Sequence, residues 1–446
     1  MTETLPDLRD GVLARVVDED VSFLRLWFTD ILGQLKSFSI GSSELKEGLL
    51  HGLVFDGSSI TGFNPVEESD MIALPDPSTF AVLPGCPDGS RVARLFCDIL
   101  TFDGTRYEGD PRHVLRRALQ RAGEMGFDDY RVGPELEFFL FRDARSIETL
   151  DEGGYFDLTA PDGGSELRRE TALALGHLGI DVAFTHHEAG PSQHEIDLRP
   201  ASAMKMADDC MTCRITVKEC AQRRGLHATF MPKPLLGENG SGMHTHQSLS
   251  AAGEDAFYDP DDRLQLSPTA KSFMAGQLRH APEMCSIFAQ WVNSYKRLVP
   301  GFEAPVYAAW SRRNRSAMLS AQPPRNDGEA CTRLELRSLD AACNPYLAFA
   351  VLLQAGLDGI AQGYELPDPM ETNLYHLTPD ERRRLAIEQL PETLGEAIEL
   401  TARSDLVLRT LGEHIFNRYV EIKRQEWDDY RVQVTSWELE RYLPVL

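Results

Sequence analysis

Basic residues are scarce in this sequence. Its 446 residues include 45 lysines and arginines against 69 aspartates and glutamates, which gives a formal net charge of −24. A surface this acidic repels the phosphates of nucleic acids and the headgroups of anionic membranes. We therefore expect no nucleic acid and no membrane among the partners of this protein.

Long apolar runs are also absent. The most apolar stretch, residues 341–361, is interrupted by Asn344, Pro345, Gln354 and Asp358. A helix that spans a bilayer needs about 20 consecutive, mainly apolar residues. We therefore interpret this stretch as a buried core helix.

Cysteines are few and irregularly spaced, which excludes a disulfide scaffold. The CMTC motif that contains Cys210 and Cys213 has no second CxxC or HxxxH partner, so we interpret these thiols and Cys220 as small buried side chains of one helix. The first residues, MTETLPDLRD, are polar and acidic, unlike a signal peptide. Both features predict a cytoplasmic protein.

Two common catalytic signatures are missing. The segment GENGSGMH, residues 237–244, is rich in glycine but lacks the Lys-Ser/Thr pair that completes a P-loop. No GxSxG nucleophile elbow occurs either. These absences exclude a P-loop nucleotide enzyme and give no support to a serine hydrolase.

The pattern of apolar residues divides the chain into two domains. Residues 1–105 alternate short apolar runs with turns, which predicts a small sheet domain. Asp110 and Pro111 then form an N-cap and first helical turn, and Gly126 ends that helix. Residues 106–446 mix short strands with helices, one of them beginning at Thr378, so the predicted fold class is α+β.

Four segments of the second domain carry ionisable side chains at every second position. On a strand, residues two apart lie on the same face. These positions are Glu135 and Glu137 in 133–141; Glu195, Asp197 and Arg199 in 193–199; His244, His246 and Ser248 in 240–249; and Arg333, Glu335 and Arg337 in 331–339.

Any one of these segments is typical of an ordinary strand with a wet face. Together, their carboxylates and imidazoles, with few lysines among them, are the ligands that hard divalent ions such as Mg²⁺ or Mn²⁺ prefer. The carboxylates are too many for a single ion that keeps part of its water, so we expect two or more ions.

Arginines accompany these carboxylates. Arg297, Arg312, Arg313 and Arg315 lie close together in sequence and add to the arginines of the strand 331–339. Guanidinium groups bind phosphate and carboxylate through paired hydrogen bonds. Divalent ions together with arginines are the equipment of phosphoryl transfer.

Several longer motifs make the sequence similar to one family over nearly its whole length. They are FDGSSITGF, PELEFFLF, HHEAGPSQHEID, NGSGMHTHQSL, NSYKRLVPGFEAP, NRSA, RLELRS and ACNPYLAFAVLLQAGLDG, in this order. The chain resembles type I glutamine synthetases. The resemblance implies a small N-terminal β-grasp domain, a large C-terminal domain with a curved antiparallel sheet flanked by helices, and a homo-dodecamer of two hexameric rings whose active sites lie between subunits.

The resemblance also implies a role for individual residues. Glu137, Glu188 and Glu195 match the ligands of one metal ion, and Glu135, His244 and Glu335 those of a second. Asn239, Gly240, Arg297 and Arg337 match glutamate contacts, and His246, Ser248 and Arg333 match nucleotide contacts. Arg315 matches the arginine at the transferring phosphoryl group, Glu303 the flap residue, Asp56 the base that deprotonates ammonium in the neighbouring subunit, and Asp70 and Tyr155 other residues of the ammonium pocket. His186, His187 and His194 are expected to be supporting or structural residues.

The implied reaction has two steps. Glutamate attacks ATP through its γ-carboxylate to give γ-glutamyl phosphate and ADP, and ammonia then displaces phosphate to give glutamine. The alternatives left open are a γ-glutamylpolyamine or other γ-glutamyl-amine synthetase, a catalytically silent structural homologue, and a phosphotransferase on the same fold.

Three features depart from the family pattern. Ser320 stands where the family often has an arginine that contacts nucleotide phosphate, and Arg325 is a candidate replacement. Asn64 and Pro65 occupy the place of an arginine connected with feedback inhibition by glutamine. Tyr375 is the counterpart of an adenylylated tyrosine, in a different local sequence.

Overall fold

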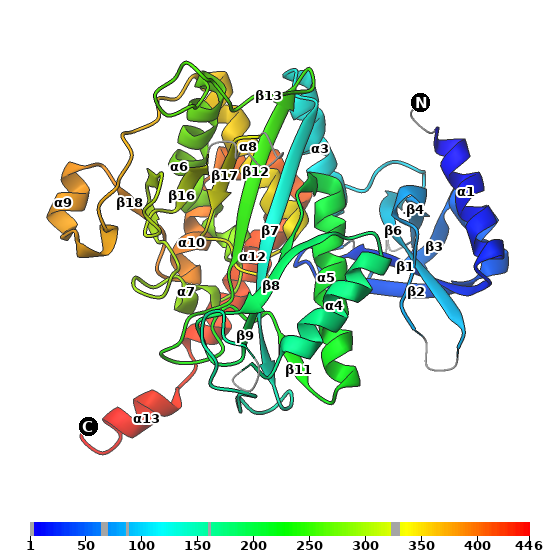
Figure 1. The fold of residues 1–446 in the computed structure, drawn as a ribbon, viewed down its shortest axis with the longest axis horizontal. Coiled ribbons are helices and arrows are strands. Elements are labelled where there is room, and N and C mark those ends of the chain that lie inside the picture. Colours follow the sequence, from blue (N-terminus) through cyan, green and yellow to red (C-terminus); the bar gives the residue numbers. More distant parts are fainter. Residues whose placement is uncertain (1–3, 64–69, 86–88, 159–161, 323–330) are drawn as a thin grey trace.

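An N-terminal sheet domain precedes a larger domain in the computed structural model, which describes residues 4–63, 70–85, 89–158, 162–322 and 331–446 (Figure 1). The sheet has the order β2-β1-β6-β4-β3, with β5 paired to β6; β1 and β6 are parallel and the other pairs antiparallel. Its elements are α1 (Leu5–Asp18), β1 (Val21–Thr29), β2 (Leu35–Gly41), α2 (Leu45–His51), β3 (Leu53–Asp56), β4 (Asp70–Pro75), β5 (Ala81–Val82) and β6 (Arg91–Thr101).

Helix α1 is an element that the sequence did not predict. Thr4 caps it by accepting from the Asp7 backbone N–H, and the Asp7 carboxylate accepts from the Thr4 backbone N–H. Only Val12 and Val16 of this helix are buried. Leu5, Leu8, Val12 and Val16 nevertheless recur at intervals of three and four residues, so the sequence does carry a helical pattern that the prediction of a sheet domain overlooked.

The two faces of the N-terminal sheet pack against different cores. Leu24 and Leu26 of β1 lie in the core of the small domain, whereas Trp27 of β1 and Phe96 of β6 pack into the main core. Trp27 and Phe96 meet edge to face, with 5.6 Å between their ring centroids. The alternation of β1 therefore fixes the small domain against the large one.

Arg112, in the first turn of α3 (Pro111–Glu124), joins the two domains through its ion pairs. Its guanidinium lies 2.7 Å from Asp76 and 3.1 Å from Asp208, and also pairs with Asp98. The three carboxylates come from the N-terminal sheet domain and from helix α5 (Ala203–Arg223) of the large domain. The buried charge of Arg112 is thus balanced from both sides of the domain junction.

We expect the substitution Arg112→Met to lower the free energy of unfolding by about 3–5 kcal/mol, because it leaves buried carboxylates without their counter-charge. Chemical denaturation measures this loss. The matched control is Arg169→Met, because Arg169 and its partner Glu166 are both 61 % exposed and an exposed pair contributes about 0–1 kcal/mol. Equal effects of the two substitutions would contradict this account of the junction.

The large domain is organised around a second sheet of order β15-β16-β17-β12-β7-β9-β8, in which β10 and β11 also pair with β7 and β13 with β12. All its pairs are antiparallel except β15 with β16. Its strands are β7 (Asp129–Phe141), β8 (Val182–His187), β9 (Gln193–Leu198), β10 (Ala201–Ser202), β11 (His227–Thr229), β12 (Met243–Ala251), β13 (Glu254–Asp255), β15 (Trp310–Ser311), β16 (Leu319–Gln322) and β17 (Arg333–Leu336).

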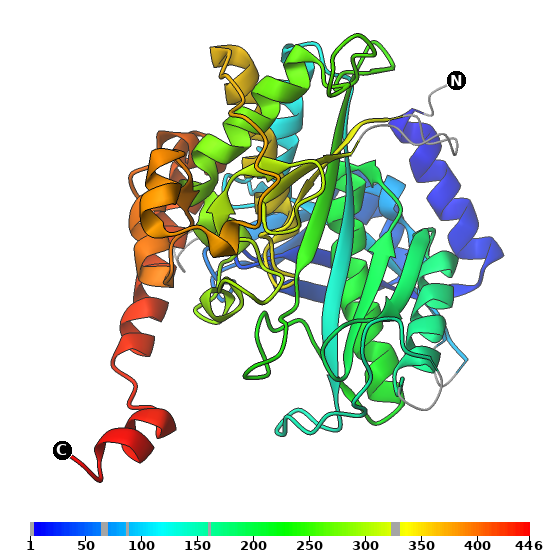
Figure 2. The ribbon, with the colours of Figure 1, turned by 60° about the vertical axis from the view of Figure 1, so that its left-hand side comes forward.

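The four segments with ionisable residues at alternate positions are neighbours in this sheet. They form β17, β12, β7 and β9, four consecutive strands of the sheet order. The long strands β7 and β12 run side by side through the centre of the molecule (Figures 1 and 2). The predicted strands are therefore confirmed, and their shared polar face is a product of the topology.

Helices flank this sheet. Those not yet named are α4 (Ser165–His177), α6 (Pro268–Phe288), α7 (Ser294–Arg297), α8 (Pro345–Gln362), α9 (Pro379–Arg384), α10 (Leu394–Thr401), α11 (Asp405–Leu411), α12 (Glu413–Arg431) and α13 (Ser436–Tyr442), and a separate strand pair joins β14 (Tyr307–Ala308) to β18 (Glu388–Gln389). The expected α+β class, with a β-grasp domain and a curved sheet flanked by helices, is confirmed.

Helix α8 confirms the interpretation of the most apolar stretch as a buried core helix. Asn344 caps it, and Pro345 begins it. At Gly359 a Cβ would collide with the Ser272 carbonyl oxygen, so only glycine allows α8 to approach α6 this closely. Among the described residues, no helix is long and apolar enough to cross a membrane.

The predicted helix around the CMTC motif is α5. Cys210, Cys213 and Cys220 are buried in it and form no disulfide. Burial raises the pKa of Cys213 to about 12, which keeps this thiol protonated. The interpretation of these cysteines as small buried side chains is confirmed.

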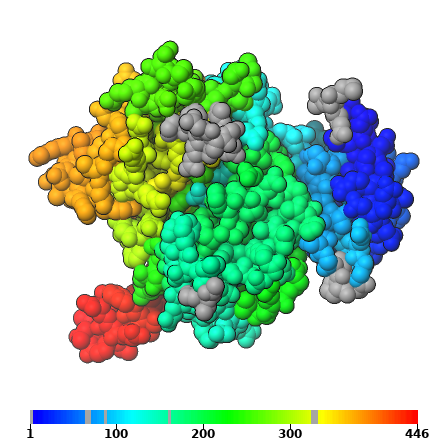
Figure 3. Space-filling model, in the orientation of Figure 1, coloured from blue at the N-terminus to red at the C-terminus, as the bar shows by residue number. Residues whose placement is uncertain are grey.

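The chain ends in a helix that projects from the body of the molecule. Helix α13 extends away at the lower left of the ribbon, and in the space-filling view it touches the rest only at its base (Figures 1 and 3). The helix and the residues after it carry exposed apolar side chains, among them Trp437, which is 58 % exposed, Leu443 and Leu446. An apolar surface on a projecting helix is typical of a contact with another chain.

Candidate active site

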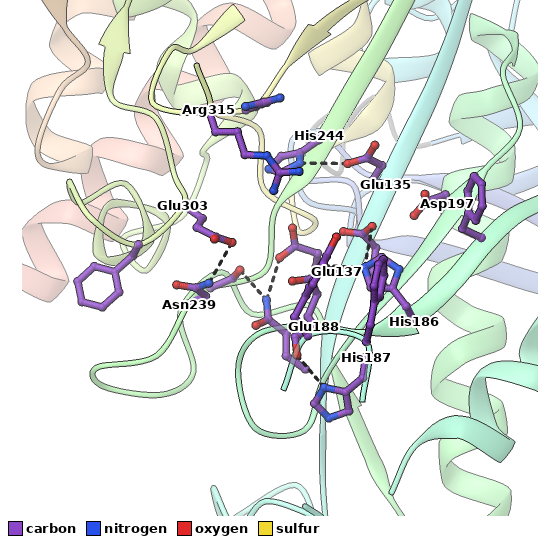
Figure 4. A pocket seen from close by; sticks show the side chains of 18 of the residues that line it. Glu135, Glu137, His186, His187, Glu188, Asp197, Asn239, His244, Glu303 and Arg315 are labelled. Atoms are coloured by element: carbon purple, nitrogen blue, oxygen red, sulfur yellow. Dashed lines mark hydrogen bonds and ion pairs between the residues drawn. The ribbon is translucent and has the colours of Figure 1, made fainter. Parts of the chain in front are cut away.

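The polar face of the large sheet borders a cavity of about 920 Å³. This volume is within the range typical of sites that bind small molecules and cofactors. Most of the predicted site residues line it: Glu135, Glu137, Tyr155, Glu188, Glu195, Asn239, Gly240, His244, His246, Arg297, Glu303, Arg315, Glu335 and Arg337. Figure 4 shows many of these side chains pointing toward a common centre.

Strand register explains why these side chains meet. His244 of β12 is opposite Glu135 of β7, and Glu137 of β7 is opposite Glu195 of β9. His246 of β12 is likewise opposite Glu335 of β17. Side chains directly opposite on antiparallel strands have their Cβ atoms about 5 Å apart. The pairing therefore assembles the cluster from distant parts of the sequence.

One group of ligands surrounds Glu135. His246 Nε2 lies 2.7 Å from Glu135 Oε1, and His244 Nδ1 lies 3.1 Å from Glu135 Oε2. Glu335 Oε1 is 3.9 Å from His244 Nδ1 and accepts from Arg337 Nε at 2.7 Å. Burial alone would raise the pKa of Glu135, but hydrogen bonds from the two imidazoles outweigh it and hold this pKa well below its usual range.

A second group contains Glu137, Glu188 and Glu195. Burial, followed by the charge of Glu188, raises the pKa of Glu137, and burial with the charge of Glu137 raises that of Glu195 well above its usual value. His186 Nε2 is 2.8 Å from Glu188 Oε1 and 3.6 Å from Glu195 Oε1. These carboxylates are crowded together with less positive charge than they require.

Both groups fit divalent cations. In each, three side chains offer ligand atoms within 4.8 Å of one another: Glu135, His246 and Glu335 in the first, and His186, Glu188 and Glu195 in the second. His244 Nε2 and His246 Nδ1 are buried without a hydrogen-bond partner among the described residues. Carboxylate and imidazole donors suit Mg²⁺ or Mn²⁺, and a cation would relieve the repulsion between the buried carboxylates.

The sequence assigned different roles to two histidines in these groups. It gave His246 a nucleotide contact and His186 a supporting role, whereas both imidazoles lie within reach of the ligand carboxylates. The strand positions of the two histidines explain why they lie near these carboxylates. His246 is two residues from His244 on β12, and His186 is opposite Glu195 in the pairing of β8 with β9.

A third cluster of ionisable residues, Asp151, His187 and His194, does not fit a metal ion. Arg168 Nη1 lies 2.8 Å from His194 Nδ1, so the other ring nitrogen carries the hydrogen. A Cβ at Gly164 would collide with this ring, which leaves no room for an ion on that side. Burial, with the charge of Arg168, lowers the pKa of His194 to about 3.

This third cluster instead supports the loop that carries Glu188. His187 Nδ1 is 2.7 Å from the Glu188 carbonyl oxygen, and His187 Nε2 is 3.0 Å from Asp151 Oδ1. The cluster therefore ties this loop to the segment that contains Tyr155. The sequence-based expectation that His187 and His194 are structural agrees with these contacts.

Arg297 and the flap residue Glu303 also line the cavity. Arg297 is 2 % exposed and donates to the backbone carbonyls of Arg337 and Ser338, each at 3.1 Å. Asn239 Nδ2 donates to Glu303 Oε2 at 3.2 Å, and the dashed line in Figure 4 marks this bond. Glu303 has a φ of 52°, a left-handed conformation that costs a non-glycine residue energy.

Four predicted residues do not line the cavity. Ser248 and Arg333 line an adjoining cavity of about 340 Å³, which shares His246 with the main one. Asp56 and Asp70 are opposite each other on β3 and β4 of the small domain. The chain thus brings the nucleotide-contact residues next to the main cavity, but leaves the two aspartates outside it.

The positions that depart from the family pattern differ in what surrounds them. Ser320 is buried on β16, where its hydroxyl donates to Glu335 Oε2 at 2.9 Å, so it supports a ligand carboxylate. Tyr375 lines the cavity, and its hydroxyl has no hydrogen-bond partner among the described residues. Asn64, Pro65 and Arg325 lie outside the described residues.

Comparisons with known proteins match both domains. A family model described as glutamine synthetase, catalytic domain, matches residues 108–442, and one described as glutamine synthetase, beta-Grasp domain, matches residues 20–102. A glutamine synthetase from Mycolicibacterium smegmatis is 50 % identical over 98 % of this chain and 99 % of its own length. Those from Thermus thermophilus and Thermotoga maritima are each 48 % identical over 97 % of this chain and 98 % of their own length.

Solved structures are also similar to this chain over nearly its whole length. A structure of GmaS in complex with ADP has a TM-score of 0.88 at 30 % identity and covers 97 % of this chain and 99 % of its own. A cryo-EM structure of Plasmodium falciparum glutamine synthetase has a TM-score of 0.88 at 25 % identity and covers 99 % of both chains.

Proposed function

We propose a role for the cavity from one premise: the chain belongs to the glutamine synthetase family and makes glutamine from glutamate, ammonia and ATP. The cavity on the large sheet holds two divalent ions, glutamate and the nucleotide phosphates. The observation that carries this proposal is the meeting of two carboxylate and imidazole groups on four adjacent strands. The family uses ATP and a divalent metal; the identity of the ions as Mg²⁺ or Mn²⁺ and their number are our proposal.

In this proposal Glu137, Glu188 and Glu195 hold one ion, and Glu135, His244 and Glu335 hold the other. The geometry adds His186 and His246 as neighbours of these two groups. When bound, such ions neutralise the charge of the carboxylate and phosphate groups that must approach each other. His246, Ser248 and Arg333 contact the nucleotide.

The remaining residues position the reactants. Asn239, Gly240, Arg297 and Arg337 hold glutamate, and Arg315 stabilises the charge that develops on the transferring phosphoryl group. Glu303, hydrogen-bonded to Asn239, closes over the γ-glutamyl phosphate and excludes water from it. Asp56 accepts a proton from ammonium, with Asp70 and Tyr155 beside it.

Asp56 and Asp70 require a second subunit in this proposal. Residues 1–105 form the domain that supplies them, and residues 106–446 form the catalytic domain of the neighbour. Their absence from the cavity of their own chain supports this arrangement. The exposure of Tyr155 at the cavity, 51 %, supports a contact between this residue and the neighbouring subunit. We propose a homo-dodecamer of two hexameric rings, in the cytoplasm.

The projecting helix α13 gives this assembly a testable prediction. Deletion of residues 433–446 removes the exposed apolar side chains that we assign to contacts between chains. We expect the deletion to shift the particle mass measured by light scattering to a smaller assembly, with each subunit still folded by circular dichroism. The control is Glu438→Gln, which leaves those side chains in place. An unchanged mass for the deletion variant would contradict the role of α13 in assembly.

The amine substrate gives a second prediction. The relatives named glutamine synthetase are 48–50 % identical to this chain, and the γ-glutamylpolyamine alternative is not favoured. With ATP, glutamate and Mg²⁺, we expect phosphate release with ammonium to exceed release with putrescine, spermine or ethanolamine by at least about 10²-fold in kcat/KM, or about 2.7 kcal/mol. Turnover with a polyamine and none with ammonium would overturn the choice of ammonia.

A further inference from the structure

Two loops that are far apart in the sequence meet at the cavity of the large sheet. Residues 233–242, here called the glutamate loop, contain Asn239 and Gly240. Residues 299–304, here called the flap, contain Glu303. Asn239 and Glu303 both line the cavity. Asn239 Nδ2 donates to Glu303 Oε2 at 3.2 Å, and Figure 4 shows these side chains pointing toward each other.

Lys233 makes a second connection between the same two loops. Its Nζ atom lies 3.8 Å from the ring centroid of Phe302 in the flap. The same ammonium group donates to the backbone carbonyl oxygen of Glu238 in the glutamate loop. A cation above an aromatic ring is attracted by the negative charge on the face of the ring. One side chain therefore holds both a neighbour of Asn239 and a neighbour of Glu303.

The surroundings of Lys233 strengthen its contact with the ring. Lys233 is half-buried, and this burial lowers its pKa. An ammonium group that has lost part of its water gains more from an aromatic face than a fully hydrated one does. The contact with Phe302 is therefore more than the chance position of a mobile surface lysine.

The backbone of Lys233 is fixed independently of its ammonium group. Asn293 Oδ1 accepts from the Lys233 N–H at 2.7 Å, and Asn293 Nδ2 donates to the Lys233 carbonyl oxygen at 3.1 Å. Asn293 directly precedes α7, which contains Arg297. The Pro232 carbonyl oxygen accepts from the Ser241 N–H at 2.8 Å and closes the base of the glutamate loop. A change confined to the end of the Lys233 side chain therefore leaves this backbone in place.

The conformation of the flap requires support from outside it. Gly301 has a φ of 97° and Glu303 a φ of 52°, and the second value costs a non-glycine residue energy. Such a conformation persists only where surrounding contacts hold it. Phe302, half-buried between these two residues, also lines the cavity. A contact that fixes the Phe302 ring therefore also fixes the residue beside it, Glu303.

We propose that Lys233 is a positioning residue that holds the flap closed over the γ-glutamyl phosphate. This inference rests on the proposed function, in which Glu303 excludes water from that intermediate. Lys233 does not touch the reactants; it acts through Phe302 and through the glutamate loop.

The reaction that a closed flap prevents is hydrolysis of the intermediate. The oxygen of water attacks the γ-carbonyl carbon, and the bond between this carbon and the phosphate oxygen breaks. Glutamate, inorganic phosphate and one proton are released. ATP is then consumed without formation of glutamine, so a loosened flap produces more phosphate than glutamine.

This excess is measured with the full-length protein, ATP, Mg²⁺, glutamate and limiting ammonium, as phosphate released minus glutamine formed. Lys233→Met keeps the length of the side chain and removes its charge. We expect the excess to rise at least about 5-fold in this variant. Lys233→Arg keeps a cation that stacks on aromatic rings, so its excess should stay within about 2-fold of that of the unaltered protein.

Lys296→Met is the matched control. Lys296 Nζ lies 5.3 Å from the ring centroid of Tyr430, and Lys296 does not line the cavity. We expect this variant to show the same excess phosphate as the unaltered protein. A fall in the kcat of Lys233→Met with no change in excess phosphate would mean that Lys233 only stabilises the fold, and would overturn the proposal.

Phe302→Leu tests whether Lys233 acts through the ring. We expect this variant to raise the excess phosphate by about the same factor as Lys233→Met. The variant with both substitutions should raise it no further, because both remove the same contact. If the two effects multiplied in the double variant, the proposed contact would not be the cause.

Hydrogen exchange tests the same contact without catalysis. In the full-length protein without substrates, we expect the backbone N–H groups of residues 301–304 to exchange at least about 5-fold faster in Lys233→Met and Phe302→Leu, and no faster in Lys296→Met. Equal exchange in all of these proteins would overturn the proposal. If the unaltered protein released no phosphate with ATP and glutamate, the proposed function would fail, whereas the exchange rates would still decide whether Lys233 holds the flap.

Discussion

The substitution Glu137→Gln is expected to abolish nearly all activity while stabilising the metal-free protein. Gln keeps the shape of the side chain and can still accept from the Gly242 N–H, which donates to Glu137 at 3.0 Å. It removes one charge from the group that contains Glu188 and Glu195. We expect kcat to fall at least about 10²- to 10³-fold, the effect of losing one charge-stabilising group in an active site.

The effect on stability has the opposite sign because the folded state disfavours the ionised form of Glu137. Burial and the charge of Glu188 raise the pKa of Glu137. When a carboxylate has a raised pKa in the folded state, the folded protein loses stability as the pH rises above the pKa that this carboxylate has in the unfolded chain. Gln avoids this cost at pH 7.5. Without metal, the midpoint of thermal unfolding is therefore expected to rise.

Metal addition separates a ligand from a structural residue. Mg²⁺ or Mn²⁺ should stabilise the unaltered protein strongly and Glu137→Gln weakly, because a ligand that binds only the folded state raises its stability. Glu148→Gln, at an exposed position paired with Arg142, is the control and should respond to metal as the unaltered protein does. If Glu137→Gln kept its activity or its full response to metal, the assignment of Glu137 as a ligand would be wrong.

Two inactive variants are expected to restore activity when they assemble together. Asp56→Asn removes the proposed base of the small domain, and Arg315→Met removes the proposed phosphoryl contact of the large domain. If each site takes Asp56 from one subunit and Arg315 from its neighbour, random mixing in equal amounts gives a complete site in about a quarter of cases. Activity measured after co-expression with two tags, and purification over both, is therefore expected to reach about a quarter of the unaltered value.

The control is a double variant that carries Asp56→Asn and Arg315→Met on one chain. Co-assembly of the double variant with the unaltered protein still yields active sites, whereas each single variant alone should be at least about 10²-fold less active. No recovery in the mixture of single variants would mean that Asp56 and Arg315 act within one chain, which would contradict a shared active site.

Much of the site could be predicted because its strands have a simple periodicity. Alternation alone predicts that Glu135 and Glu137 share one face of a strand, and that His244 and His246 share another, and β7 and β12 have this alternation. The sequence alone could not show that β17, β12, β7 and β9 are neighbours, because strand order depends on packing between distant segments. The motif resemblance assigned residues of these strands to shared metal sites, but it gave no strand order.

Other features depend on contacts that no local pattern encodes. The position of His186 beside Glu188 and Glu195 follows from the pairing of β8 with β9, which the sequence did not predict.

The central claim is that two divalent ions bind the two carboxylate and imidazole groups of the cavity. Anomalous diffraction from crystals grown with Mn²⁺, glutamate and a non-hydrolysable ATP analogue tests it most directly. The account predicts one strong manganese peak among Glu137, Glu188 and Glu195, and another among Glu135, His244 and Glu335. Manganese peaks only outside this cavity, with both groups free of metal, would contradict it.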